Sequence, residues 1–305
     1  MNMRHLATYT FSILLFAASA VPAQDSVSYD QKIDVVYGEV HGTGLLMDVF
    51  TPKGKSNGLA IIDVVSGAFF SDRGKIREHT MGRIYQIFCA RGYTVFALRP
   101  GSRTRYTGLE MAANVKTGIR YVKQHATEYK IDPDSLGITG ASAGGNLATL
   151  VAVTPEEPKG EGSAARAGTS VKAAAVFFPP TDFLDWDGKP ANLAVIGELL
   201  FLGGSKGHSD EEMKEKAEQI SPARLVKTKP VPFLLIHGDA DPTVPLQQSQ
   251  KMVEVLKSAG GSAELIIKKG GGHPWMTIYE EVKIMADWFD KQLPTASDAS
   301  PAGQK

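Results

Sequence analysis

Short apolar segments alternate along this chain with segments whose apolar residues recur at helical spacing, and this alternation constrains the fold more than any other feature. Strands that are separated by helices along a chain pair in parallel, and the helices then cover both faces of the sheet. The sequence therefore predicts an α/β fold with a mostly parallel central sheet of about eight strands. The expected strands are Ile33–Tyr37, Gly44–Phe50, Leu59–Val65, Tyr93–Leu98, Ser135–Thr139, Val171–Phe178, Phe233–His237 and Ala263–Ile267.

The helices that this pattern requires are expected between the strands, in a single domain over residues 24–293. From residue 179 to 230 the alternation breaks, and irregular chain leads into "SDEEMKEKAEQI", which is typical of a capped amphipathic helix. We interpret residues 179–230 as a small insertion after the sixth strand, a cap region of the kind that often shapes a substrate pocket. The expected helices outside this insertion are Thr80–Ala90, Leu109–Ala126, Gly145–Val153, Gln247–Ala259 and Met276–Leu293.

Both ends of the chain differ in composition from the rest. The N-terminus combines Arg4, an apolar stretch over residues 11–18 and small residues that suit cleavage after Ala20 or Ala23, which predicts a signal peptide over residues 1–23. Later apolar stretches are too short to span a membrane. We therefore expect a periplasmic or secreted protein with no stable membrane anchor after cleavage. The tail over residues 294–305 is small and polar, and we expect it to be disordered.

Charge and cysteine content argue against several classes of partner. The 33 basic and 33 acidic residues balance without a block of like charge, so a nucleic-acid partner is not expected. Cys89 is the only cysteine, which excludes an intrachain disulfide, and its apolar surroundings indicate a buried residue and not a nucleophile. The glycines at 270–272 lack the lysine and hydroxyl of a phosphate loop, and no dinucleotide fingerprint occurs, so we expect no nucleotide cofactor.

The segment "LGITGASAGGNLATL" carries the clearest chemical motif, with Ser142 between Gly140 and Gly144. A strand that turns sharply into a helix holds such a serine in a strained conformation above the sheet edge, where its hydroxyl can meet a substrate. Ser205 lies in a second Gly-x-Ser-x-Gly match. It leaves only one strand, Phe233–His237, before the acidic candidates, so we interpret it as part of a glycine-rich turn.

A serine hydroxyl needs a base and an orienting carboxylate to become a strong nucleophile. Two candidate acids, Asp239 and Asp241, follow a strand in "FLLIHGDADPTVP", and His273 follows the next strand in "LIIKKGGGHPW". Asp241 precedes a restricted Pro-Thr-Val-Pro loop and is the preferred acid, while Asp239 is expected to brace the turn. A metal site at His237, Asp239 and Asp241 is disfavoured, because alternate residues at a strand exit rarely converge without further ligands.

These motifs together resemble the α/β-hydrolase superfamily, in particular the esterase/lipase branch of bacterial acetyl-esterase and feruloyl- or acetylxylan-esterase-like proteins. The resemblance runs from about Leu59 to Leu293 and implies an α/β-hydrolase fold. It also implies a serine carboxylic ester hydrolase that needs no metal or other cofactor and acts on small-molecule or carbohydrate-linked esters. In such an enzyme Ser142 attacks the ester carbonyl, His273 carries the proton to the leaving alcohol, and Asp241 holds the imidazole. No oligomeric state is predicted.

One segment departs from the family's pattern. After the third strand such enzymes usually carry a His-Gly-Gly-type motif whose backbone N–H groups bind the developing oxyanion. Here the corresponding residues, 66–70, read Ser-Gly-Ala-Phe-Phe. Backbone N–H groups need no particular side chain, so Gly67 or Ala68 is expected to donate alongside Ala143.

Three aromatic residues are candidates for the pocket wall. Phe69 and Phe70 follow the expected oxyanion donors, and they either line the substrate pocket or pack under the insertion. Trp186, in the insertion, either closes the same pocket or is simply buried within the insertion.

The sequence is also compatible with two other functions. A peptidase of the prolyl-oligopeptidase type has a similar triad, but this chain has no room for the N-terminal propeller of such enzymes. A non-catalytic binding protein with a hydrolase fold is prompted by the altered oxyanion segment.

Overall fold

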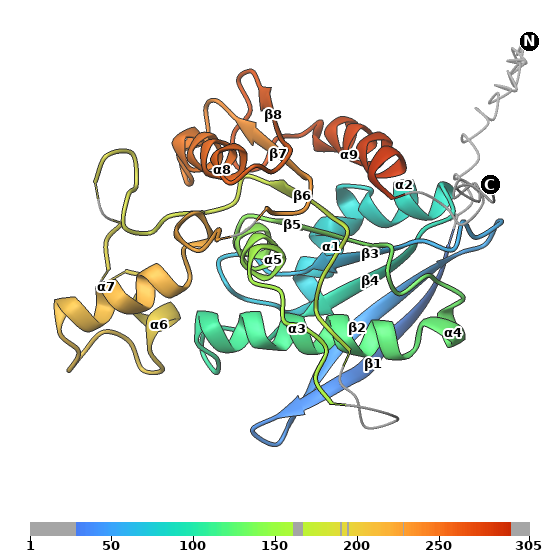
Figure 1. Ribbon diagram of the computed structural model, residues 1–305, viewed down its shortest axis with the longest axis horizontal. Coiled ribbons are helices and arrows are strands. Elements are labelled where there is room, and N and C mark those ends of the chain that lie inside the picture. Colours follow the sequence, from blue (N-terminus) through green and yellow to red (C-terminus); the bar gives the residue numbers. More distant parts are fainter. Residues whose placement is uncertain (1–28, 161–166, 190, 194, 228, 294–305) are drawn as a thin grey trace, which may run out of the picture.

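The structure, a computed structural model, describes residues 29–160, 167–189, 191–193, 195–227 and 229–293 (Figure 1). The predicted signal peptide and the predicted tail lie outside the described residues. An eight-stranded sheet with the order β1-β2-β4-β3-β5-β6-β7-β8 forms the centre of the molecule, and a strand is present at each predicted position. This confirms the predicted fold class. The strands are Tyr29–Val40 (β1), Thr43–Pro52 (β2), Ala60–Val64 (β3), Thr94–Arg99 (β4), Leu136–Ala141 (β5), Ala173–Phe177 (β6), Phe233–Gly238 (β7) and Ala263–Lys268 (β8).

Six neighbouring strands, from β4 to β8 in the order of the sheet, pair in parallel, while β1, β2 and β4 form antiparallel pairs at one end. Helices cover both faces, and β3 is accordingly buried along its whole length, with Asp63 as its one residue that is not apolar. Because parallel strands point the same way, the loops that follow β3, β5, β7 and β8 all emerge at one edge of the sheet. This edge is where the predicted site residues lie.

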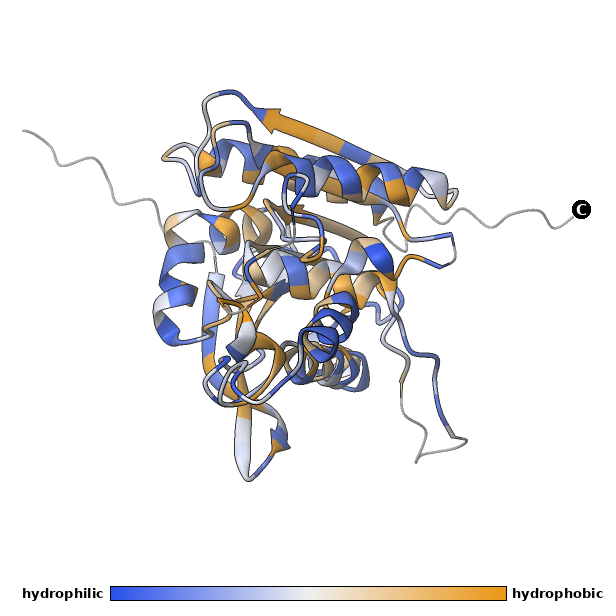
Figure 2. Ribbon diagram, turned by 90° about the vertical axis from the view of Figure 1, so that its left-hand side faces the viewer, coloured by the Kyte–Doolittle hydropathy of each residue, from blue (hydrophilic) through white to orange (hydrophobic). Residues whose placement is uncertain are grey.

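The helices form two layers, each with its own hydrophobic core. Residues of α3, α5 and α8 pack in one core, and residues of α1, α2 and α9 pack in the other. In Figure 2 the outer helices carry hydrophilic residues on one side and hydrophobic residues on the other, as expected of helices that cover a core with one face. None of the helices in the described ranges is long and apolar enough to cross a bilayer. The helices are Arg73–Met81 (α1), Ile84–Ala90 (α2), Gly108–Gln124 (α3), Ala126–Tyr129 (α4), Ala143–Val153 (α5), Gly197–Leu200 (α6), Asp210–Gln219 (α7), Leu246–Ser258 (α8) and Ile278–Gln292 (α9), with a 3₁₀ turn, η2, at Pro222–Arg224.

The helix predicted at Thr80–Ala90 is wrong in extent. The chain instead forms α1, which begins after the N-cap Asp72, and the shorter α2. Arg83 lies between them with φ 60°, a left-handed conformation that interrupts a helix. The apolar spacing of α2 is continuous with the end of α1, so the sequence pattern alone predicts one helix there.

Between β6 and β7 the chain forms α6, α7 and η2, which extend beyond the end of the sheet (Figure 1). Ser209 accepts a hydrogen bond from the Glu212 N–H, and the Glu212 side chain accepts one from the Ser209 N–H, so α7 begins with a capping box. The helix predicted from the capped sequence is therefore present.

Candidate active site

Ser142 occupies the sharp turn between β5 and α5. Its backbone has φ 53° and ψ −119°, a strained conformation for a residue with a side chain. The flanking glycines permit this turn, because a Cβ on Gly140 would lie 2.5 Å from the Gly144 carbonyl carbon, and one on Gly144 would lie 2.1 Å from the Val64 oxygen. The turn holds Ser142 at the edge of the sheet where the strands end.

The structure brings Ser142, His273 and Asp241 together from three separate loops. The His273 Nδ1 atom lies 2.7 Å from Asp241 Oδ2, and its Nε2 atom lies 2.8 Å from Ser142 Oγ. A carboxylate only accepts hydrogen bonds, so Nδ1–H donates to Asp241 and Nε2 is left to accept the Ser142 hydroxyl proton. This is the tautomer that a general base at a serine requires.

The two candidate acids, Asp241 and Asp239, have different surroundings in the structure. The Asp241 side chain is fully buried, and its Oδ1 accepts hydrogen bonds from the Thr243 and Val244 N–H groups at 2.8 and 2.9 Å. Asp239 is exposed and accepts a bond from the Gly270 N–H at 2.6 Å. Asp241 therefore contacts the histidine, and Asp239 braces the two loops.

His237 lies beneath Asp241 and is fully buried. Its Nε2–H donates to the Val244 carbonyl at 2.9 Å and lies 3.4 Å from Asp241 Oδ2, while its Nδ1 lies 2.7 Å from the Ser249 hydroxyl. Burial lowers the pKa of the His237 imidazole, and the neutral ring that results suits these bonds. Both nitrogens are thus occupied by protein atoms, and no group of residues in the described ranges is arranged to hold a metal ion.

The segment after β3 forms a tight turn beside the nucleophile. The Gly67 N–H donates to the Phe70 carbonyl at 2.9 Å and the Phe70 N–H donates back to Gly67 at 2.8 Å. Ala68 and Phe69 have φ values of 49° and 62°, as in a type I′ turn. The Gly67 N–H is already engaged within the turn, so of the two alternatives, Gly67 and Ala68, the structure leaves only Ala68 with a free N–H.

Two of the predicted oxyanion donors have a free backbone N–H group. Neither the Ala68 N–H nor the Ala143 N–H has an acceptor among the described residues. The two segments are joined by a hydrogen bond from the Gly144 N–H to the Ser66 carbonyl at 2.9 Å. Ala68 and Ala143 are therefore the two predicted donors that the structure leaves free.

The aromatic candidates lie in two different environments. Phe69 is buried, and its ring centroid is 6.5 Å from that of Phe183, which in turn stacks on Trp186 at 5.9 Å. Phe70 is half-buried, with the Arg103 guanidinium 4.9 Å above its ring. Of the two, Phe69 packs beneath the insertion.

Phe178 is a site residue that the sequence analysis missed. Its ring centroid lies 4.3 Å from the His273 ring and 5.8 Å from Trp275, and its backbone has φ 34°. A bulky residue with positive φ directly after a strand is costly, and such strain gathers at functional sites. The only sequence signal is its position before two prolines, which marks a strand exit without showing where the ring points.

Ser205 and Cys89, the other two candidate nucleophiles, do not contact Ser142, His273 or Asp241 in the structure. Ser205 lies in the loop between α6 and α7. Cys89 is buried in α2, and burial raises the pKa of its thiol to about 12, which keeps it protonated and unreactive.

Comparison with known proteins places the sequence in a family. The sequence model of the BD-FAE family matches residues 47–256. The chain is 29% identical over 235 residues to the probable carboxylic ester hydrolase LipM of Mycobacterium tuberculosis, covering 75% of this chain and 52% of LipM. It is 27% identical over 236 residues to the esterase LipQ of the same organism, covering 76% of this chain and 54% of LipQ. This chain thus spans about half the length of these curated relatives.

Solved structures show the same architecture. A truncated form of a carbohydrate esterase from gut microbiota superposes with a TM-score of 0.73 at 26% identity, covering 88% of this chain and 98% of that one. Esterase 2 of Thermogutta terrifontis superposes with a TM-score of 0.66 at 23% identity, covering 90% of this chain and 95% of that one. Because the family match spans more than half of the sequence and solved esterases share the fold, the chain belongs to the BD-FAE family, in the esterase/lipase branch of the α/β-hydrolases.

Proposed function

We propose that this protein is a serine hydrolase that cleaves small carboxylic esters through an acyl-enzyme. The hydrogen-bonded chain from Ser142 through His273 to Asp241 is the observation that carries the proposal. Two relatives that are named as ester hydrolases, LipM and LipQ, support it.

Each group in the site has a step to perform. His273 Nε2 takes the proton from Ser142 as its oxygen attacks the ester carbonyl, and Asp241 stabilises the imidazolium that forms. The negative charge that develops on the carbonyl oxygen is bound by the Ala68 and Ala143 N–H groups, and each such donor contributes a factor of about 10²–10³ to the rate. His273 then protonates the leaving alcohol. In the second half of the reaction it activates the water that releases the acid.

A substitution series tests this proposal. Wild-type protein is expected to hydrolyse p-nitrophenyl acetate, and Ser142→Ala is expected to lose about 10⁶-fold in kcat. Ser205→Ala is the matched control, since it removes the other serine of a Gly-x-Ser-x-Gly sequence and is expected to keep full activity. Unchanged hydrolysis by Ser142→Ala would refute the proposal.

Amide cleavage is a second candidate function. The chain is 26% identical over 232 residues to the uncharacterized peptidase YuxL of Bacillus subtilis, covering 70% of this chain and 32% of YuxL. Comparing kcat/KM for matched ester and peptidyl-amide substrates separates the two activities. A non-catalytic role is tested by a fluorophosphonate probe, which labels Ser142 only if the site is reactive.

We also propose that the substrate is a small-molecule or carbohydrate-linked ester and that the protein is periplasmic or secreted. The similarity to a carbohydrate esterase supports the first point, and the N-terminal sequence supports the second. N-terminal sequencing of the protein from culture fractions would show whether cleavage occurs after Ala20 or Ala23.

A further inference from the structure

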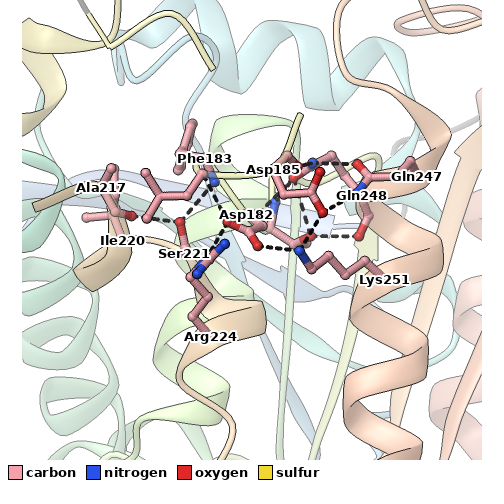
Figure 3. Close-up of polar contacts among 12 residues, drawn as sticks. Asp182, Phe183, Asp185, Ala217, Ile220, Ser221, Arg224, Gln247, Gln248 and Lys251 are labelled. Atoms are coloured by element: carbon pink, nitrogen blue, oxygen red, sulfur yellow. Dashed lines mark hydrogen bonds and ion pairs between the residues drawn. The ribbon is translucent and has the colours of Figure 1, made fainter. Parts of the chain in front are cut away.

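A buried carboxylate holds the insertion onto the body of the protein. Asp182 is fully buried, accepts a hydrogen bond from Arg224 Nε at 2.7 Å on one oxygen, and accepts one from Lys251 Nζ at 2.6 Å on the other. Lys251, on α8, also donates to Asp185 at 2.7 Å (Figure 3). Burial alone would raise the pKa of Asp182, but the bonds from Arg224 and Lys251 outweigh it and hold the pKa below its usual range.

Uncharged groups fix the same segment at further points. Gln248, on α8, accepts hydrogen bonds from the Thr181 and Asp182 N–H groups at 2.8 and 2.7 Å and donates to the Asp185 carbonyl at 2.7 Å. Ser221 accepts from the Phe183 N–H at 2.9 Å (Figure 3). The backbone of residues 181–185 is therefore held by α8 on one side and by the end of the insertion on the other.

This segment carries aromatic side chains toward the candidate active site. Phe183 follows Asp182 directly, stacks on Trp186, and packs against Phe69 of the turn Gly67–Phe70, which is called the oxyanion turn below because it carries the proposed donor Ala68. Asn146, in the first turns of α5 after the nucleophile, donates to the Pro180 carbonyl at 2.9 Å. Displacing the segment would move the Phe183–Trp186 ring pair relative to both the oxyanion turn and Ser142.

We propose that Asp182 and Lys251 are positioning residues that set the place of the Phe183–Trp186 ring pair and thereby the selectivity of the site for larger esters. This inference rests on the proposed ester hydrolysis for its kinetic consequence. Neither residue contacts the hydrogen-bonded chain of Ser142, so the expected effect is on the substrate's fit and not on proton transfer. The ion pair is suited to this role because a buried carboxylate that is bonded on both oxygens leaves the backbone around it little freedom.

The kinetic test uses Lys251→Met, which keeps most of the aliphatic stem and leaves Asp182 bonded to Arg224. Ethyl acetate is small on both sides of the ester, and naphthyl butyrate is large on both sides. For Lys251→Met, kcat/KM for naphthyl butyrate is expected to fall about tenfold, mainly through KM, while that for ethyl acetate stays within about twofold. Lys251→Arg restores both carboxylate contacts and is expected to recover most of the loss.

The chain offers a matched control in Arg91. Its side chain is 27% exposed, as is that of Lys251, and it bridges Asp287 and Asp290 of α9 just as Lys251 bridges Asp182 and Asp185. The Asp287 and Asp290 side chains are exposed whereas Asp182 is fully buried, so Arg91→Met removes a bridge of the same form at the surface and is expected to leave the ratio of the two kcat/KM values unchanged. A parallel fall for both esters in Lys251→Met, or an unchanged ratio, would overturn the inference.

A second measurement does not depend on catalysis. The chain contains three tryptophans, so 5-fluorotryptophan labelling gives three ¹⁹F resonances, and Trp186→Phe identifies that of Trp186. Lys251→Met is expected to shift or broaden the Trp186 resonance, and Arg91→Met is expected to leave it in place. A Trp186 resonance that does not respond to Lys251→Met contradicts the inference, whereas a response in a protein that hydrolyses no ester contradicts only the proposed function.

Discussion

The His237 ring lies against the far side of the Asp241 carboxylate, with Nε2 3.4 Å from the oxygen that accepts the His273 hydrogen bond. Two histidines thus approach one carboxylate oxygen, and only His273 reaches the nucleophile. The Val244 carbonyl fixes the orientation of His237, because it accepts the Nε2–H at 2.9 Å. His237 is in this way a support for Asp241 and for the loop that carries it.

His237→Gln is expected to lower kcat/KM by about 10- to 100-fold, because loosening this loop misplaces Asp241 and through it His273. Steady-state kinetics with p-nitrophenyl acetate measures the loss. His125→Gln serves as the control, since His125 bonds to the Tyr121 carbonyl at the end of α3 and contacts none of the site residues. Wild-type kinetics in His237→Gln would show that Asp241 holds its position without this support.

The two aspartates after β7 are expected to differ sharply. Asp241→Asn keeps the size of the side chain but favours the wrong His273 tautomer, and kcat is expected to fall about 10⁴-fold. Asp239→Asn keeps an oxygen for the Gly270 N–H, so its activity is expected to stay within about threefold of wild type. Comparable losses in the two variants would contradict the assignment of Asp241.

The oxyanion turn stores backbone strain at Ala68, which is exposed and has φ 49°. Ala68→Gly removes the Cβ that disfavours this conformation while keeping the N–H. The free energy of unfolding is expected to rise by about 0.5–1 kcal/mol, the strain relieved less the greater entropy of the unfolded glycine. Urea unfolding measures this change.

The matched control for this variant is Ala113→Gly, at an exposed position within α3, where the same substitution is expected to destabilise by about 1 kcal/mol. Destabilisation by Ala68→Gly of the same size would mean that the turn is not strained.

A second buried histidine, His79, is expected to make stability depend on pH. The His79 Nδ1 atom lies 2.7 Å from Asp63 Oδ2, which also accepts a bond from the Tyr85 hydroxyl at 3.1 Å. Burial alone would lower the pKa of His79, but the charge and the hydrogen bond of Asp63 outweigh it, so the pKa in the folded protein is raised. The stabilisation by protonated His79 is complete below the unfolded value of about 6.5 and is lost as pH rises through the raised pKa of the folded protein.

Urea unfolding of wild type and His79→Gln from about pH 6 to about pH 9 tests this prediction. The advantage of wild type in free energy of unfolding is expected to shrink as pH rises. A difference that is constant over this range, or one that grows, would contradict it.

The sequence predicted the parts of this molecule that depend on periodicity and chain order. Strand ends in a parallel sheet meet at one edge, so the order Ser142, Asp241, His273 was sufficient to expect these residues side by side. The stiffness of the loop that follows favours Asp241 over Asp239, and the hydrogen bonds from the Thr243 and Val244 N–H groups to Asp241 show the same restriction.

The parts that could not be predicted depend on backbone conformation at single residues. The Gly67 N–H faces Phe70 because Ala68 and Phe69 adopt positive φ. Alanine and phenylalanine rarely adopt this conformation, so the sequence does not predict it. Arg83 also adopts positive φ, and this conformation separates α1 from α2. The support that His237 gives Asp241 was also missed, since a histidine next to two acids first suggests a metal ligand.

The hydrogen bond between the Gly144 N–H and the Ser66 carbonyl ties the start of α5 to the end of β3. This bond links the nucleophile turn to the segment that leads into the Gly67–Phe70 turn, so we expect the two turns to open together in local unfolding. A thermal fluctuation that opens this contact releases Ser142 and Ala68 together. Heating is therefore expected to lower the fraction of active molecules, while each molecule that stays active keeps its kcat.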